Sequence, residues 1–273
     1  MQYFFKKLNL KICLWVLLVG TIPANSLAKV EKQAFERGLI LLGGPSLTNV
    51  MHEILKDFSL KRNISIASTF SATEELATSI EEGEPANIFI SEDPIRMRDL
   101  QRKGVLNVYS LTDLATDKLV IVMPKKHYLL KKLGNFENFT KKLKFVMQNS
   151  IMAVTDPESD PSGYYTKQAL EVMGLWETAK LRTIKTDNTR RSMYLSRYSN
   201  NPSIVYYSDA AKNPNVKIIG EIPQKYYDKI IYQAAIVAEI SSGSDLKDSE
   251  EFVKYLKSEK VIQQFKDKGF GGV

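Results

Sequence analysis

Three hydroxyl side chains lie where an expected strand gives way to an expected helix: Ser46, Thr73 and Ser162. The first residues of a helix carry unpaired backbone N–H groups, and a hydroxyl beside them adds another donor. Such donors can cap the helix or bind an anion, because the helix dipole favours negative charge at that end. Taken singly, each hydroxyl is explained by capping; if the three positions meet, they form an anion site.

The common catalytic motifs do not occur in the sequence. H-E-x-x-H, G-x-S-x-G and P-loop patterns are absent, and the two histidines are His52, in a helical pattern, and His127, in a lysine-rich loop. We interpret both as surface residues. An enzyme with Ser46 or Tyr206 as nucleophile or acid is an alternative, but no histidine lies in a matching loop to act as its base. We therefore expect a protein that is not an enzyme, with no cofactor and no metal cation.

The first 28 residues have the features of a secretory signal. Lys6, Lys7 and Lys11 are followed by the apolar run 12–19, and Ser26-Leu27-Ala28 supplies small residues at a cleavage position. A membrane anchor is the alternative, but it needs about 20 apolar residues. We therefore predict a cleaved signal peptide, 1–28, and export to the periplasm.

Removal of this segment changes what the composition implies. It removes Cys13, the only cysteine, which lies at the start of the apolar run, whereas a lipid-attachment cysteine would follow it. The remaining chain of about 245 residues can bury an ordinary core without disulfides. Because the segment holds three lysines and no acid, the net charge falls from +7 to +4. This mild charge gives no reason to expect a nucleic-acid partner.

Strands and helices alternate along the chain. Strands are expected at 39–42, 64–70, 86–90, 119–123, 152–154, 203–206, 216–219 and 231–237, and helices at 47–58, 71–83, 93–104, 164–173, 189–198 and 246–268, the last broken near Ser258. Ser71 and Glu74 have the spacing of a capping box. The alternation is typical of α/β proteins with parallel sheets flanked by helices, which bind ligands at the carboxyl ends of their strands.

The alternating pattern occurs twice, which predicts two lobes. The first is interrupted by the second and resumes with the C-terminal helices, so the chain should cross between lobes near 116–119 and near 231–233. The expected division is a signal peptide at 1–28, lobe I at 29–116 and 233–273, and lobe II at 117–232.

Five segments follow one another in a recognisable order: Ser46–Asn49, Glu82–Ser91, Asp156–Pro157 with Gly163–Tyr165, Ile204–Ala210, and Lys268–Phe270. Together they resemble the periplasmic molybdate-binding proteins of ABC importers, a branch of the type II solute-binding proteins, from about residue 38 to the C-terminus. The resemblance implies an α/β, two-lobed type II periplasmic-binding-protein fold. Each lobe would be a mostly parallel sheet flanked by helices, with the ligand cleft between the lobes.

The resemblance also implies a ligand site made of hydroxyls and backbone N–H groups, without metal or arginine. Carried over, its residues are Ser46, Thr73, Ser162, Thr189 and Tyr206. Thr73 takes a position where many relatives have serine, and Ser162 one often filled by alanine, where the main-chain N–H binds. Asn188 aligns nearly as well as Thr189. The chain departs from the family at Gly43-Gly44-Pro45, where small residues, often alanines, are common and where proline removes one backbone donor.

No carboxylate falls among these contacts; Asp156 and Asp187 are the nearest in sequence. A site of donors suits a fully deprotonated tetrahedral dianion, so we expect molybdate or tungstate to bind, sulfate to bind weakly and phosphate to be rejected. The alternatives are another oxyanion such as sulfate or chromate, a small organic acid, or a domain that senses its ligand. The expected protein is a monomer that delivers its oxyanion to an ABC importer permease in the membrane.

Overall fold

The computed structural model describes residues 38–134, 136, 138–238 and 244–273, and the predicted signal peptide lies outside them. The described strands form two five-stranded sheets. The first has the order β2-β1-β3-β10-β4, from Ser65–Phe70, Gly38–Gly43, Ile88–Ser91, Ile230–Ile236 and Thr112–Asp117. The second has the order β7-β6-β8-β5-β9, from Thr183–Thr186, Met152–Thr155, Ser203–Tyr206, Leu119–Pro124 and Val216–Glu221.

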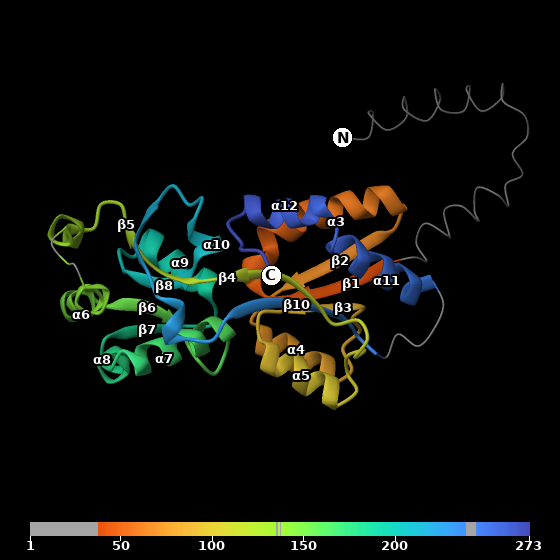
Figure 1. Ribbon diagram of the computed structural model, residues 1–273, viewed down its shortest axis with the longest axis horizontal. Coiled ribbons are helices and arrows are strands. Elements are labelled where there is room, and N and C mark those ends of the chain that lie inside the picture. The colour runs from red at the N-terminus through yellow and green to blue at the C-terminus, as the bar shows by residue number, and fades with distance from the viewer. Residues whose placement is uncertain (1–37, 135, 137, 239–243) are drawn as a thin grey trace, which may run out of the picture. The chain divides into compact units, whose positions relative to one another are not determined.

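Both sheets are mixed, and helices flank each of them (Figure 1). In the first, β1 pairs in parallel with β2 and β3, whereas β10 pairs antiparallel with β3 and β4. In the second, β6 pairs in parallel with β7 and β8, whereas β5 pairs antiparallel with β8 and β9. The predicted two-lobed α/β fold with mostly parallel sheets is confirmed, because four of the five strands in each sheet run in the same direction. One antiparallel strand, adjacent to a crossing between the sheets, enters each sheet next to its parallel strands.

Residues of the first sheet alternate between two apolar layers. Leu41 and Ile88 pack in one layer with helices α3 (Thr48–Arg62), α11 (Ser244–Leu256) and α12 (Glu259–Asp267). Their neighbours Leu42 and Phe89 pack in another layer, with α4 (Thr73–Glu81) and α5 (Pro94–Arg102). Figure 1 shows these two groups of helices on opposite faces of the sheet. This two-sided burial explains why β1 and β3 are apolar without a break.

The second sheet follows the same rule. Ile121 and Ile204 pack in the layer formed with α6 (Phe139–Asn149), α7 (Pro161–Val172) and α8 (Trp176–Leu181). Val120 and Val205 pack instead with α9 (Thr189–Tyr198) and α10 (Tyr207–Ala210). Three short 3-10 helices complete the described elements: η2 (Pro45–Leu47), η3 (Tyr128–Lys132) and η4 (Gln224–Tyr226). No helix in the described ranges is long and apolar enough to span a bilayer.

The start of α4 differs from the predicted capping box. The helix begins at Thr73, its N-cap residue is Ala72, and no side chain caps it. Ser71 Oγ donates instead to Glu75 Oε2, at 2.8 Å. Because α4 starts two residues beyond Ser71, that serine cannot reach the first backbone donors of the helix. These donors therefore remain available to another acceptor.

The chain crosses between the sheets twice. The first crossing is short: β4 ends at Asp117 and β5 begins at Leu119, within the predicted segment. The second runs from residue 222 to residue 229, because β9 ends at Glu221 and β10 already pairs with β4 from Ile230. It therefore precedes the predicted segment 231–233, which lies inside β10.

Candidate binding site

The five residues predicted to bind the ligand all lie at the carboxyl ends of strands. Ser46 follows β1 in η2, Thr73 opens α4 after β2, Ser162 lies in the first turn of α7 after β6, Thr189 opens α9 after β7, and Tyr206 ends β8. All five are buried, with no more than 4% of any residue exposed. Their positions agree with the rule that open α/β sheets bind ligands at this edge.

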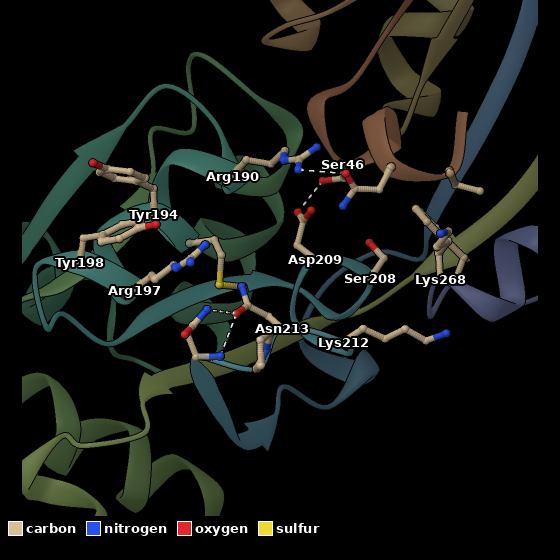
Figure 2. Close-up of a pocket in the computed structure, with 16 residues that line it drawn as sticks. Ser46, Arg190, Tyr194, Arg197, Tyr198, Ser208, Asp209, Lys212, Asn213 and Lys268 are labelled. Carbon is tan, nitrogen blue, oxygen red and sulfur yellow. Dashed lines mark hydrogen bonds between the residues drawn. The ribbon is translucent and has the colours of Figure 1, made fainter. Parts of the chain in front are cut away.

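Ser46 reaches across to the second sheet. Its Oγ donates a hydrogen bond of 2.6 Å to Asp209 Oδ2, and Asp209 belongs to α10 (Figure 2). Burial raises the pKa of Asp209, although the Ser46 hydroxyl, the Arg190 charge and the Thr189 hydroxyl oppose the shift. Arg190 also donates to the carbonyl oxygen of Pro45 at 3.1 Å. The loop after β1 is therefore held against the second sheet by one hydroxyl and one guanidinium.

Thr73 and Ser162 approach each other through two buried carboxyls. Thr73 Oγ1 donates to Glu92 Oε2 at 3.3 Å. Ser162 Oγ donates to Asp160 Oδ1 at 2.6 Å, and the Ser162 amide donates to the same oxygen at 3.1 Å. The backbone amide of Thr73 acts on Asp160 as well, and Asp160 and Glu92 repel each other. Thr73 from α4, which packs on the first sheet, and Ser162 from α7, which packs on the second, thus contact the same pair of acids.

Two tyrosine hydroxyls lie near Glu92 and Asp160, and we call the buried region around these four residues the interior. Tyr206 and Tyr232 are fully buried, and their ring centroids lie 6.3 Å apart. Neither hydroxyl has a hydrogen-bond partner within the described part of the chain. The Tyr206 amide donates to Thr189 Oγ1 at 3.4 Å, which fixes the predicted contact Thr189 beside the predicted contact Tyr206. A buried hydroxyl without a partner is costly, so these two groups have hydrogen-bonding capacity to offer a ligand.

The acids of this interior share raised pKa values. Burial raises the pKa of Asp160 to about 6 and that of Asp117 to about 7. Burial and the neighbouring Asp160 charge raise the pKa of Glu92 well above its ordinary value. The Glu92 carboxyl also packs closely against the loop after β1, because a Cβ atom at Gly44 would lie 2.5 Å from Glu92 Oε2. A residue without a side chain is needed there to make room for the carboxyl.

These acids correct one prediction. A site lined only by donors was expected, with Asp156 and Asp187 as the nearest carboxylates. Asp156 instead pairs with Lys185 at 3.0 Å, and each acid at the site contacts a predicted ligand residue: Asp209 with Ser46, Glu92 with Thr73, and Asp160 with Ser162. Carboxyl oxygens that could accept the proton of a bound phosphate therefore lie beside the predicted ligand residues, so the absence of an acceptor cannot be the reason for rejecting phosphate.

Four residues of the candidate site were not predicted from the sequence: Glu92, Asp160, Asp209 and Tyr232. For Asp160 a signal existed, because an aspartate directly before a proline marks a helix start, and Asp160 is the N-cap of α7 with Pro161 next. Pro45 occupies the same kind of position, at the first residue of η2, where a missing N–H costs little. Glu92 and Tyr232 could not be predicted from their neighbours in sequence, because the approach of Glu92 to Thr73 and that of Tyr232 to Ser46 depend on the tertiary fold.

A cavity of about 550 Å³ opens beside Ser46 and Asp209 (Figure 2). Its lining includes Arg190, Arg197, Lys212 and Lys268. Of the five predicted ligand residues, only Ser46 lines it, and the other four are buried elsewhere. In the described ranges, no group of three or more histidines, cysteines or acids is arranged to hold a metal ion.

Residues 39–271 match the family model described as "Bacterial extracellular solute-binding protein". The chain belongs to this family. As a member of a family of binding proteins, it is not an enzyme, as the sequence predicted.

Curated relatives in this family carry more specific names. The molybdate-binding protein ModA of Escherichia coli (strain K12) is 29% identical over 254 residues, which is 91% of this chain and 92% of the relative. The ModA protein of Haemophilus influenzae is 28% identical over 231 residues, 82% of this chain and 86% of the relative. The resemblance inferred from the five ordered segments is confirmed at this level.

Solved structures support the fold. The Azotobacter vinelandii periplasmic molybdate-binding protein superposes with a TM-score of 0.69 at 20% identity, covering 85% of this chain and 98% of that one. A tungstate ABC transporter protein of Geobacter sulfurreducens gives a TM-score of 0.63 at 14% identity, covering 85% and 99%. At these identities the comparison establishes the architecture of this solute-binding protein but does not identify its ligand.

Proposed function

We propose that this solute-binding protein captures a tetrahedral oxyanion outside the cytoplasm, with molybdate or tungstate as its ligand, and delivers it to an ABC importer. The observation that supports the proposal is that five predicted ligand residues lie at the carboxyl ends of strands from both sheets and are all buried: Ser46, Thr73, Ser162, Thr189 and Tyr206. The Tyr206 hydroxyl is buried and has no hydrogen-bond partner among the described residues, so it is free to donate to a ligand. The names of the ModA relatives support the choice of ligand.

Physical chemistry favours this use of the donors. A tetrahedral dianion loses its hydration on binding, so a site must replace it with several aimed hydrogen bonds. Each hydrogen bond to a charged group contributes about 1.5–3 kcal/mol net of water. A micromolar dissociation constant requires about 8 kcal/mol, which a few such bonds supply. The backbone amides that begin α4, α7 and α9 add the favourable end of three helix dipoles.

The proposal includes export and delivery. Residues 1–28 would be cleaved as a signal peptide, and the mature protein would act in the periplasm as a monomer that docks on the importer's permease. Lobe I would comprise 29–116 and 233–273 and lobe II 117–232, with β10 joining the first sheet three residues before the second boundary. The lobes would close on the ligand, which small-angle scattering would register as a fall in radius of gyration with molybdate; an unchanged radius at saturation would argue against closure.

A thermal-shift panel of oxyanions tests the ligand class. Molybdate and tungstate at about a hundred times their dissociation constants should raise the free energy of unfolding by about 2.7 kcal/mol. Chloride at the same ionic strength is the control for salt effects, and sulfate and small organic acids represent the alternative ligands. Stabilisation by an organic acid alone would replace the oxyanion proposal.

A further inference from the structure

Two buried carboxyls in the candidate site each keep one oxygen free of hydrogen bonds. Glu92 Oε1 and Asp160 Oδ2 make no hydrogen bond of normal geometry within the described residues, and the two residues are 0% and 3% exposed. The backbone amides of Glu92 and Thr73 lie near these carboxyls and oppose the rise in their pKa values, but burial outweighs them. Their other oxygens accept from Thr73 and Ser162, two of the predicted ligand residues. The free oxygens therefore lie among the groups expected to contact the ligand, and an anion entering there must meet them.

We propose that Glu92 and Asp160 make oxyanion binding proton-coupled: when the anion enters, one of these carboxyls takes a proton from solvent and donates it to the anion as a hydrogen bond. This inference rests on the proposed function, because it concerns the same site and the same ligand class. No bond within the anion is made or broken. One proton moves from solvent to a carboxyl oxygen, and the bound state holds one negative charge fewer than two ionised acids would leave.

Charge balance requires this coupling. The groups that face the pair are acidic or neutral: Asp93 from the start of α5, Asp209 from α10, and the hydroxyls of Tyr206, Tyr165 and Tyr232 from β8, α7 and β10. None of the groups that most strongly shift the pKa of Glu92 or Asp160 is a cation. Arg190 acts on Asp209 instead. A dianion beside two ionised carboxylates would be repelled strongly in this water-poor interior, where charge is screened weakly.

The geometry makes protonation productive as well as necessary. An ionised carboxylate only accepts hydrogen bonds, whereas a protonated one has an O–H to donate. The hydrogen bonds that Thr73 and Ser162 donate to Glu92 Oε2 and Asp160 Oδ1 can remain in place. The added proton therefore binds Glu92 Oε1 or Asp160 Oδ2, the oxygens without a partner among the described residues. Burial already raises the pKa of both acids, to about 6 for Asp160, and an incoming anion raises it further. A pair of carboxylates that repels the anion when both are ionised offers it one additional donor when one of them is protonated.

Calorimetric titration of the purified protein with molybdate measures the coupling directly. Titrations in two buffers of different ionisation enthalpy give the number of protons taken up per anion. We expect about one proton to be taken up at about pH 8, which lies above the pKa of about 6 of Asp160 in the free protein. The affinity should then fall about tenfold for each pH unit above neutrality. Equal affinity at about pH 6.5 and about pH 8.5, with no net proton uptake, would overturn the proposal.

The double variant Glu92→Gln/Asp160→Asn separates a proton-coupled role from a structural one. Both amides can still accept from Thr73 and Ser162, so the local hydrogen bonds are kept. We expect proton uptake to vanish, the pH dependence to flatten, and molybdate to bind several-fold more tightly than in the wild type at about pH 8.5. Carboxyls needed only as structural supports would give weaker binding at every pH. Glu82→Gln, at an exposed acid after α4, is the matched control and should leave the proton count unchanged.

The two proposals fail differently. If molybdate, tungstate and sulfate give no binding heat and no thermal stabilisation at either pH, the proposed function fails and the coupling falls with it. If molybdate binds but carries no proton with it, the function stands and the coupling is wrong. Should the double variant not fold, the proton count of the wild type still decides the matter.

Discussion

The sealed interior and the open cavity beside it are opposite in charge, although Ser46 and Asp209 touch both. The interior holds Glu92 and Asp160, and none of the groups that most strongly shift their pKa values is a cation. The cavity is lined by Arg190, Arg197, Lys212 and Lys268 around Asp209, with Lys268 paired to Glu53 at 2.5 Å. Exposed cations attract an anion over a distance but hold it weakly, because water screens them. Aimed hydrogen bonds in a dry site hold it selectively. We therefore propose that the cavity attracts the anion and that the interior captures it.

The largest expected effect comes from removing a direct donor of the interior. Ser46→Ala and Tyr206→Phe should each weaken molybdate binding by about 1.5–3 kcal/mol, an order of magnitude or more in affinity. Stability should change least in Tyr206→Phe, because the Tyr206 hydroxyl has no partner among the described residues to lose, whereas Ser46→Ala removes the hydrogen bond to Asp209. Titration calorimetry measures the affinities, and Tyr194→Phe, at an exposed tyrosine of α9 that lines the cavity, is the control. Wild-type affinity in both interior variants would show that the site lies elsewhere.

The buried acid at the first crossing should make stability depend on pH. Burial raises the pKa of Asp117 from 3.8 to about 7, so folding favours its protonated form. The stabilisation is complete below about pH 4 and is lost as pH rises through about 7. Asp117→Asn keeps an acceptor for the amides of Lys118 and Ser208, which bond Asp117 Oδ1. The variant should match the wild type at about pH 4 and exceed its free energy of unfolding by about 1–3 kcal/mol at about pH 8.

Urea titrations at both pH values would measure this difference. Asp113→Asn, at an exposed acid on the same strand, should show no such pH-dependent gain. A variant less stable than the wild type at about pH 8 would mean that the Asp117 charge stabilises the crossing.

The smallest expected effect concerns the cavity. Arg197→Gln and Lys212→Gln remove exposed charges near Ser46, so they should slow molybdate association a few-fold at low salt and leave dissociation nearly unchanged. The difference should disappear at high salt, because screening removes long-range attraction. Stopped-flow measurements would follow both rates, with Lys125→Gln as an exposed control of the same charge change. A large rise in the dissociation rate would mean that the cavity itself holds the anion.

Ordered motifs and periodicity predicted the parts of this molecule that depend on neighbours in sequence. Apolar runs identified β1 and β5, and the ordered segments placed Ser46 and Tyr206 at strand ends. Contacts between the two sheets could not be predicted, because nothing near Asp160 in sequence indicates that it lies beside Thr73. The predicted capping box failed for a related reason, since the spacing is compatible with more than one helix start and packing selected Thr73.

A crystal structure of the protein with tungstate, located by the anomalous scattering of tungsten, would show directly where the anion binds. We expect one strong peak in the interior, with the anion's oxygens within about 3 Å of Ser46 Oγ and the Tyr206 hydroxyl. Backbone amides at the starts of α4 and α7 should complete the shell. A peak found only in the cavity, among Arg190, Arg197 and Lys212, would show that the basic cavity is the binding site and that the interior is not.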